Sequence, residues 1–413
     1  MARLDDAKEM YENLGVDVDK ALAKLQKVKI SMHCWQGDDV CGFENSGDLS
    51  GGIATTGNYP GKARTPDELM DDIDQALRLI PGKHKLNLHS IYAITDEKPE
   101  RDALEPRHFK KWQDFAKERG LGLDFNPTFF SHPKAADGLT LSHPDAKIRK
   151  FWIRHAKCCR AIAEHFGKKL GIPSLNNIWV PDGFKDIPAD RLSPRKRLRD
   201  SLDEIFDEKR DGKYLYDSVE SKLFGLGLEA CTVGSHEFYM NYAAKRGVLC
   251  LLDNGHFHPT ESVGDKIPSM LLFNDMMALH VSRPVRWDSD HVVLLNDDLR
   301  EIANEIVRCN ALDKVLIALD YFDASVNRVA AWVVGMRNMQ KAILAALLTP
   351  WKEFAKLQNE GRSYELMALM EELRTYPMGD VWNAFCEMNN VPVMQNWLTD
   401  VKQYEQDVQR KRG

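Results

Sequence analysis

The sequence predicts an α/β protein, a (β/α)₈ TIM barrel with an additional helical extension on its carboxyl-terminal side. Between residues 28 and 340, short apolar segments rich in β-forming residues alternate with helical patterns eight times, which is typical of a parallel sheet. From about residue 341 onward the pattern is helical throughout. A parallel sheet with this many strands most economically closes into a barrel, and an open doubly wound sheet is the alternative.

The composition is that of an ordinary soluble globular protein. A chain of 413 residues with 43% hydrophobic content can bury one large core or two ordinary ones. Its formal net charge of -6 gives no electrostatic reason to bind nucleic acid or an anionic membrane. No stretch approaches the ~18 apolar residues of a membrane span, and the first residues do not resemble a secretion signal. Eight cysteines without a C-x-x-C pair predict free thiols in a reducing compartment, so we expect a cytoplasmic protein.

The elements follow one another in a regular order. Residues 1–27 are predicted to form two short amphipathic helices broken near Gly15, and residues 28–340 form the barrel. The predicted strands lie within residues 28–35, 85–93, 121–130, 174–183, 216–225, 247–257, 277–283 and 314–322. The clearest helices between them cover residues 66–80, 105–120, 145–167 and 193–210. Residues 341–413 form the helical extension, whose expected role is packing on a neighbouring subunit or on the barrel itself.

The segment after the first predicted strand is a long run rich in Gly, Asn and Thr. Such a run is too long for a simple connection, and long loops in compact domains are usually functional. We expect residues 48–64 to close over a bound ligand as a lid, because excluding water would protect a reactive step.

Ionisable and aromatic side chains gather near the ends of the predicted strands, where a barrel has its active site. The candidates are His33, His89, Asp124, Trp179, Asp182, Glu220, Lys222, Asp253, His256, His280, Asp288, Asp290 and Asp320. Taken singly, each has an ordinary explanation, such as a hydrogen-bonded structural histidine or an aspartate that caps a turn. Taken together they converge on one rim. Oxygen and imidazole donors in such a group suit Mn²⁺, Co²⁺, Zn²⁺ or Mg²⁺.

The charges in this group predict how many ions it holds. Its carboxylates are Glu220, Asp253, Asp288, Asp290 and Asp320. Each pair would repel by about 3 kcal/mol at ~5 Å and an effective dielectric near 20. Two divalent cations and the ammonium of Lys222 bring the formal sum of these charges to zero. The sequence therefore predicts two metal ions, which could share a bridging carboxylate.

Several longer motifs resemble a known family. The stretches SMHCWQGDDVCGFE, GNYPGKAR, DFNPTFFSHP, DNGHFHPTE and SRPVRWDSDHVVLL resemble the L-rhamnose isomerase family, one of the two-metal sugar isomerases of the xylose isomerase type. The resemblance covers nearly the whole chain. It implies a (β/α)₈ barrel, a homotetramer, two metal ions per subunit with Mn²⁺ preferred, and a small-molecule sugar substrate. The implied reaction interconverts L-rhamnose and L-rhamnulose by a metal-assisted hydride shift.

The resemblance also implies the metal ligands. The substrate-orienting metal is expected on Glu220, Asp253, His280 and Asp320. The catalytic metal is expected on His256, Asp288 and Asp290, with Asp253 available as a bridge. Asp323 competes with Asp320 for the role on the last strand. We prefer Asp320 because it closes the apolar run, whereas Asp323 opens the following helix and could cap it.

Other residues carry expected roles toward the substrate. His89 and Lys222 correspond in type and strand to residues that assist ring opening and hold the sugar O1, and they join His256, Asp288 and Asp290 as expected catalytic residues. Trp35, Phe130 and Trp179 are expected to give the sugar an apolar wall beside Lys222. The alternative for these rings is that they are core aromatics.

Other functions stay open. A metal-dependent hydrolase or phosphodiesterase also uses clustered His and Asp, but such sites usually carry a His-x-His pair or a basic groove, and His256-Phe-His258 is the nearest approach. A sugar-binding protein whose metals only stabilise the fold is a second possibility, and an isomerase of a related aldose is a third. His236-Glu237 begins like a zinc-protease helix but has no second histidine.

Overall fold

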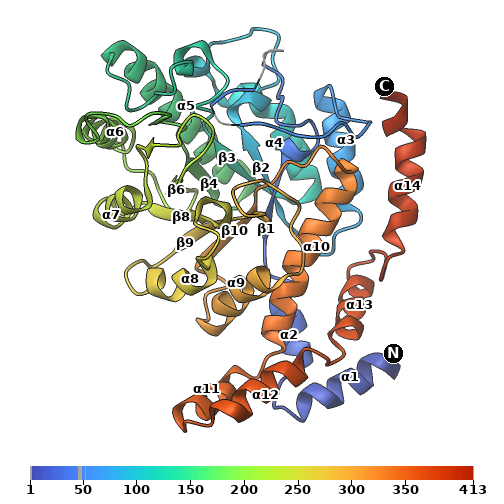
Figure 1. Ribbon diagram of the computed structural model, residues 1–413. Helices are drawn as coiled ribbons and strands as arrows, with labels where there is room; N and C mark the ends of the chain where they lie inside the picture. The colour runs from blue at the N-terminus through green and yellow to red at the C-terminus, as the bar shows by residue number, and fades with distance from the viewer. Residues whose placement is uncertain (1, 45–48, 52, 413) are drawn as a thin grey trace.

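The computed structural model describes residues 2–44, 49–51 and 53–412. Eight parallel strands close into a barrel in the order β1-β10-β9-β8-β6-β4-β3-β2 (Figure 1). The strands are β1 (Ile30–His33), β2 (Lys85–His89), β3 (Gly122–Asn126), β4 (Ser174–Ile178), β6 (Leu215–Glu220), β8 (Leu249–Asp253), β9 (Met277–Val281) and β10 (Val315–Leu319). Seven of them lie within one predicted segment each, and β6 begins one residue before its predicted segment. The (β/α)₈ prediction is therefore confirmed, and the open-sheet alternative is wrong.

Helices form the outer layer of the barrel (Figure 1). They are α3 (Pro66–Leu77), α4 (Lys110–Arg119), α5 (Ala146–Leu170), α6 (Leu192–Ile205), α7 (His236–Arg246), α8 (Val263–Leu271), α9 (Asp297–Arg308) and α10 (Arg328–Leu347). Helix α3 shows why they form. Thr65 caps its first turn by accepting a hydrogen bond from the Glu68 backbone N–H, and Pro66 occupies the first helical position. Leu69, Ile73 and Ala76 then recur on one buried face.

The strands are buried on both sides, as expected for a parallel sheet covered by helices. All residues of β3, β4 and β9 are buried. The register between β8 and β9 pairs Asp253 with His280. Because parallel strands end at the same edge of the barrel, the register alone brings these two polar side chains together.

Short 3-10 turns begin where several strands end. They are η1 (Cys34–Gln36) after β1, η2 (Ser90–Tyr92) after β2 and η6 (Asn254–His256) after β8. The turn η6 ends at His256, which lines the cavity described below. A second, antiparallel sheet of two short strands, β5 (Gly183–Phe184) and β7 (Cys231–Thr232), lies outside the barrel and was not predicted.

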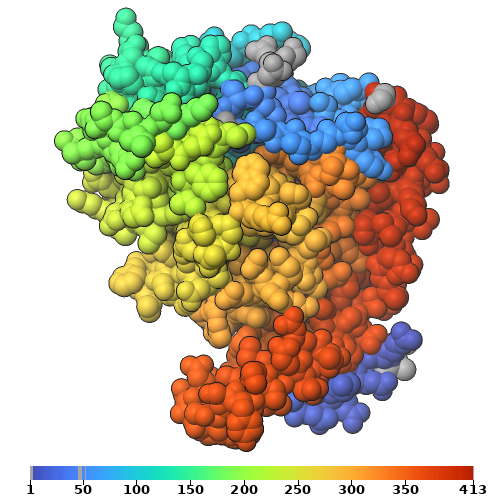
Figure 2. Space-filling view, in the orientation of Figure 1, coloured from blue at the N-terminus to red at the C-terminus, as the bar shows by residue number. Residues whose placement is uncertain are grey.

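The helices outside the barrel lie along one side and at the lower end of the molecule (Figure 1). They are α1 (Ala2–Glu12), α2 (Val18–Leu25), α11 (Trp351–Asn359), α12 (Ser363–Leu373), α13 (Met378–Met388) and α14 (Trp397–Asp407). Helix α10 runs continuously through the expected boundary between residues 340 and 341. Helices α11 and α12 project from the body as a lobe that Figure 2 shows in orange-red. Within the described residues, no helix combines the length and apolar character needed to cross a membrane.

Candidate metal centre and adjoining pocket

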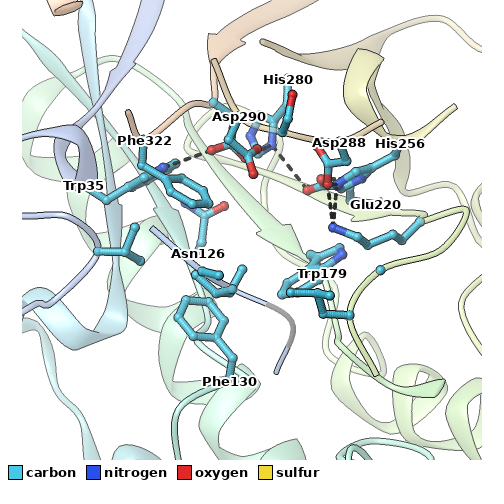
Figure 3. Close-up of a pocket in the computed structure, with 18 of the residues that line it drawn as sticks. Trp35, Asn126, Phe130, Trp179, Glu220, His256, His280, Asp288, Asp290 and Phe322 are labelled. Atoms are coloured by element: carbon cyan, nitrogen blue, oxygen red, sulfur yellow. Dashed lines mark hydrogen bonds and ion pairs between the residues drawn. The ribbon is translucent and has the colours of Figure 1, made fainter. Parts of the chain in front are cut away.

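A cavity of about 350 Å³ opens at the carboxyl ends of the barrel strands (Figure 3). Its volume is in the range of small-ligand sites. The predicted residues that line it are Trp35, His89, Phe130, Trp179, Glu220, Lys222, His256, His280, Asp288, Asp290 and Asp320. Side chains from segments far apart in the sequence therefore meet at one place.

The first group of converging donor atoms comes from the ends of four strands. Glu220, Asp253, His280 and Asp320 each offer a ligand atom, and these atoms lie within 4.8 Å of one another. The Nδ1 atom of His280 lies 3.3 Å from Glu220 Oε2 and 3.2 Å from Asp320 Oδ2. Two neighbouring side chains donate hydrogen bonds to carboxylates of this group. The Asn177 amide donates to Glu220 Oε2 at 2.5 Å, and the Trp35 indole N–H donates to Asp320 Oδ1 at 2.9 Å.

A second group shares one residue with the first. Donor atoms of Asp253, His256 and Asp288 also lie within 4.8 Å of one another. His256 Nε2 is 3.2 Å from Asp288 Oδ2, and the ammonium of Lys222 is 2.6 Å from the same oxygen. Asp290 lines the same cavity but belongs to neither group of converging atoms. The structure therefore brings together all the predicted ligands except Asp290, which stands beside them.

The pKa shifts describe a crowded, buried charge cluster. Burial raises the pKa of Asp253 to about 7, because a carboxylate loses its solvation there. Burial alone would lower the pKa of His256, but the carboxylates of Asp253 and Asp288 together outweigh it and the pKa rises to about 9. Burial likewise opposes the charged form of Lys222, yet the carboxylates of Asp288 and Asp290 together hold the pKa of this ammonium above its usual range. Burial and the Asp288 carboxylate raise the pKa of Asp290 well above its usual value. The cluster attracts positive charge.

Several buried polar atoms of the site have no hydrogen-bond partner among the described residues. They include both ring nitrogens of His280, whose contacts with carboxylates lack hydrogen-bond geometry, and Oδ1 of Asp288. Buried polar atoms are almost always paired, so these need an explanation. Imidazole nitrogens and carboxylate oxygens at such spacing are ligands of divalent cations. The residues present therefore fit metal ions.

Aromatic rings form the wall opposite the acidic groups (Figure 3). The ring of His89 lies edge-on to Trp35, with centroids 4.8 Å apart, and to Phe130, with centroids 5.5 Å apart. Burial lowers the pKa of His89 to about 4, so its imidazole is neutral near pH 7. The Lys222 ammonium stands 5.3 Å from the centre of the Trp179 ring. The predicted aromatic residues line the cavity, and Trp35 and Phe130 are at the same time buried members of the hydrophobic core.

The chain matches the family model of L-rhamnose isomerase (RhaA) over residues 1–412. It belongs to the L-rhamnose isomerase family. It is 59% identical to an L-rhamnose isomerase of Listeria monocytogenes serotype 4a over 411 residues, which cover 99% of this chain and 98% of that one. It is 56% identical to an L-rhamnose isomerase of Salmonella paratyphi B over 408 residues, which cover 98% and 97% of the two chains. The predicted family and isomerase class are confirmed.

Solved structures add less to this assignment. An L-ribulose 3-epimerase aligns with a TM-score of 0.49 and 12% identity, covering 80% of this chain and 97% of that chain. A likeness at this level carries no argument about function. The assignment to the L-rhamnose isomerase family therefore rests on the family model and the sequence relatives.

In this L-rhamnose isomerase family member, Asp320 and Asp323 have different surroundings. Asp320 stands in the first group of donor atoms. Oδ1 of Asp323 accepts hydrogen bonds from the backbone N–H and the hydroxyl of Ser325, at 2.9 and 2.5 Å. Its backbone also forms a reciprocal pair with the Gln36 amide, at 2.8 and 2.9 Å. The geometry therefore favours Asp320 as the ligand and gives Asp323 the part of a turn cap.

Three other candidates neither line the cavity nor belong to the two groups of donor atoms. Asp124 forms a buried ion pair with Lys85. Asp182 is fully buried and accepts hydrogen bonds from the backbone N–H groups of Thr140 and Ser142, at 2.9 and 2.8 Å. His33 is fully buried, and its ring lies edge-on to that of Tyr321 at 4.3 Å. Asp124 and Asp182 therefore have structural partners, and His33 is packed against Tyr321.

The sequence did not identify the amides of the site. Asn126 and Asn177 line the cavity from the ends of β3 and β4, and Asn177 holds Glu220. The sequence offered one signal for these residues, which is a polar amide side chain within an otherwise apolar strand. Phe322 also lines the cavity, from the residues after β10.

The glycine-rich segment contributes to the opening of the cavity. Ile53, Ala54 and Thr56 line it. The segment then lies against the residues after β10, because the Tyr59 backbone N–H donates to the Ala324 carbonyl at 2.8 Å. Asp48 and Gly52, which belong to the expected lid, lie outside the described residues. Lid closure over a ligand stays a prediction.

Proposed function

We propose that this protein interconverts L-rhamnose and L-rhamnulose as a two-metal aldose-ketose isomerase. One observation carries the proposal: in a chain of this family, two groups of metal-ligand atoms share Asp253 beside a cavity of about 350 Å³. One ion would be held by Glu220, Asp253, His280 and Asp320. The other would be held by His256 and Asp288, with Asp253 shared and Asp290 beside them. Mn²⁺ is our preferred ion, with Zn²⁺, Co²⁺ or Mg²⁺ as alternatives.

The reaction moves the C2 hydrogen of the open-chain aldose to C1 with its electron pair, while the O2 proton passes to O1. Two divalent ions, held by the residues named above, would supply Lewis acidity for the negative charge that develops on the sugar oxygens. The Lys222 ammonium would hold O1 by charge-assisted hydrogen bonding. Neutral His89 would hold a ring hydroxyl and assist ring opening. The rings of Trp35, Phe130 and Trp179 would keep water from the reacting carbons.

The route between the carbons is testable with labelled substrate. We expect L-rhamnose deuterated at C2 to keep its label on C1 of the product, because a direct transfer never releases the hydrogen to water. The product is examined by mass spectrometry and NMR after partial turnover. Wholesale exchange with solvent would replace the direct shift with an enediol route that uses a carboxylate base.

The function itself is tested by metal depletion and reloading. Protein treated with a chelator should lose turnover while keeping its circular dichroism spectrum, and Mn²⁺ should restore turnover of L-rhamnose. A panel of ordinary and deoxy aldoses then decides between L-rhamnose and a related sugar. Unfolding on chelation, with no turnover under any metal, would support a binding protein whose ions only stabilise the fold.

A phosphodiesterase is less well supported by the cavity. Among the described residues that line it, Lys222 is the only lysine or arginine. A phosphodiester would need further positive charge to offset its own. Turnover of a model phosphodiester, with none of any aldose, would favour this alternative.

The helical extension is proposed to join subunits of a homotetramer. Helix α12 has no buried residue, and its exposed side chains include Tyr364 at 73% and Met367 at 65% exposure. Large exposed apolar patches commonly mark protein interfaces. Analytical ultracentrifugation should give a tetramer, and a variant with Tyr364→Ser and Met367→Ser should form smaller species. A monomeric parent protein would contradict this assignment.

We also propose a cytoplasmic location. All eight cysteines are free thiols. Free thiols are typical of reducing compartments, whereas proteins in oxidising ones usually pair them. Cell fractionation with compartment markers tests the location.

A further inference from the structure

His236 is the first residue of α7 and does not line the cavity, yet it contacts two segments that do. Its Nε2 atom lies 2.8 Å from the backbone carbonyl oxygen of His256. Its Nδ1 atom is in hydrogen-bond contact with the hydroxyl of Ser221. A carbonyl oxygen only accepts, so Nε2 carries the proton, and in the neutral ring Nδ1 then accepts from the Ser221 hydroxyl. Both hydrogen bonds therefore fit the same neutral tautomer.

A third hydrogen bond closes this arrangement into a ring. The Nδ1 atom of His256 lies 2.8 Å from the backbone carbonyl oxygen of Ser221, so His256 donates back to Ser221. Ser221 joins to His236, His236 joins to His256, and His256 returns to Ser221. This ring links the end of β6 to the turn after β8. It also leaves Nε2 of His256 as the nitrogen that faces Asp288, at 3.2 Å.

This ring of hydrogen bonds affects the site through the two neighbours of Ser221 in the chain. Glu220 and Lys222 flank Ser221 in the chain, and both line the cavity. The Lys222 ammonium lies 3.3 Å from His256 Nε2. A shift of Ser221 relative to His256 would therefore change the spacing between Lys222 and His256 directly.

Packing holds the His236 ring in place. It is stacked on Phe257, with centroids 3.9 Å apart and planes 12° from parallel. The residues before α7 are fixed to the same strand end, because the Lys222 backbone N–H donates to the Gly234 carbonyl at 3.2 Å. His236 can therefore transmit the position of α7 to the site.

We propose that His236 is a positioning residue. Through Ser221 and the His256 backbone it fixes Lys222 against His256, and so fixes the imidazole that would hold the second ion. The inference rests on the proposed function and deepens it. It also gives a role to a histidine whose sequence context began like a zinc-protease helix. Residues that orient metal ligands in this way commonly change metal affinity by about 10–100-fold.

Substitutions separate the two hydrogen bonds of His236. His236→Phe keeps an aromatic ring on Phe257 but removes both bonds. His236→Gln keeps an N–H donor for the His256 carbonyl, and His236→Asn keeps an acceptor for Ser221. Ser221→Ala removes the donor from the other side. The matched control is His165→Phe, which removes a histidine hydrogen bond to Gln113 (2.8 Å) on α5.

The measurement is Mn²⁺ binding to metal-depleted protein by calorimetry, followed by kcat and KM with L-rhamnose. We expect His236→Phe to weaken one of two Mn²⁺ sites about 10–100-fold and to lower kcat more than it raises KM. His236→Gln and His236→Asn should fall between this variant and the parent. Ser221→Ala should add little in the His236→Phe background, because the bond it removes is already absent. His165→Phe should bind both ions like the parent.

The outcomes separate this inference from the proposed function. If the parent binds two Mn²⁺ ions and isomerises L-rhamnose, but His236→Phe does the same with unchanged affinities and kinetics, only the positioning role is overturned. A variant that loses thermal stability alone would also overturn it. If His236→Phe does not fold, the two amide variants decide by the same titration. If the parent itself binds no Mn²⁺, both proposals fail. If it binds two ions without isomerising any aldose, only the function fails, and the titrations still test His236.

Discussion

Asp72 and Arg412 form a bidentate, buried ion pair across 340 residues of sequence. The two guanidinium nitrogens lie 2.6 and 2.9 Å from the two carboxylate oxygens, and the Tyr404 hydroxyl donates to the same carboxylate at 2.8 Å. The pair joins α3 of the barrel to the residues that follow α14. The helical extension is therefore fastened to the barrel by specific charges as well as by apolar packing.

Removing one partner of this pair should be costly. Arg412→Met leaves the Asp72 carboxylate buried without its counter-ion, so the free energy of unfolding should fall by about 3–5 kcal/mol in urea denaturation. The control is Arg410→Met, which breaks an exposed pair with Glu405 and should cost about 1 kcal/mol or less. Equal losses in the two variants would contradict the importance of burial here.

Two substitutions test which aspartate after the last strand, Asp320 or Asp323, is the metal ligand. Asp320→Asn replaces a carboxylate of the first donor group, so we expect lower metal content and at least about a 100-fold loss of kcat, comparable with the loss of an electrostatic catalytic group. Asp323→Asn keeps an oxygen acceptor for Ser325, so metal content should stay at that of the parent. Elemental analysis and steady-state kinetics give both results. The reverse pattern would make Asp323 the ligand.

The indole of Trp35 should act on the metal through Asp320. Trp35→Phe keeps an aromatic ring in the cavity wall but removes the N–H that donates to Asp320 at 2.9 Å. We expect about a tenfold loss of Mn²⁺ affinity in calorimetric titration, in the range seen when a ligand loses its orienting partner. Trp351→Phe is the control, because its indole N–H donates to the Ala346 carbonyl at 2.8 Å outside the site. If the Mn²⁺ affinity of Trp35→Phe is unchanged, Trp35 acts only as part of the aromatic wall of the cavity.

The sequence was informative about the barrel for a physical reason. Strand and helix patterns are local, and parallel strands must end at one edge, so the meeting of Glu220 with His280 follows from the alternation itself. The excess of carboxylates at the site was also predictable, because these residues can be counted in the sequence. The resemblance of the motifs then predicts a place for each ligand.

Contacts between distant segments could not be predicted in the same way. Nothing local marks Asp72 as the partner of Arg412, because the pair forms only after α14 has packed beside α3. The hydrogen bond from Asn177 to Glu220 likewise depends on the register between β4 and β6. Strands β5 and β7 have only two residues each, too few for a periodic pattern.

The loss of folding stability at acid pH tests a buried histidine of the core, His84, that lies outside the site. His84 is fully buried, with Nε2 2.8 Å from the Pro81 carbonyl oxygen and Nδ1 accepting from the Ile30 backbone N–H at 3.3 Å. These bonds require a neutral ring, and burial lowers the pKa of His84 to about 4. The unfolded chain has a histidine pKa of about 6.5. Between these values the unfolded state binds more protons, so the stabilisation present above about pH 6.5 is lost as pH falls toward 4.

The difference of roughly 2.5 pKa units corresponds to about 3 kcal/mol for this one group. Urea unfolding of His84→Gln between pH 4 and 7 should therefore show a shallower decline than the parent, because glutamine keeps a donor and an acceptor but does not titrate. His258→Gln, the same substitution at an exposed position, is the control. Parallel curves for the parent and His84→Gln would mean that His84 takes up its proton without unfolding the core, and that another buried histidine such as His155 sets the acid limit.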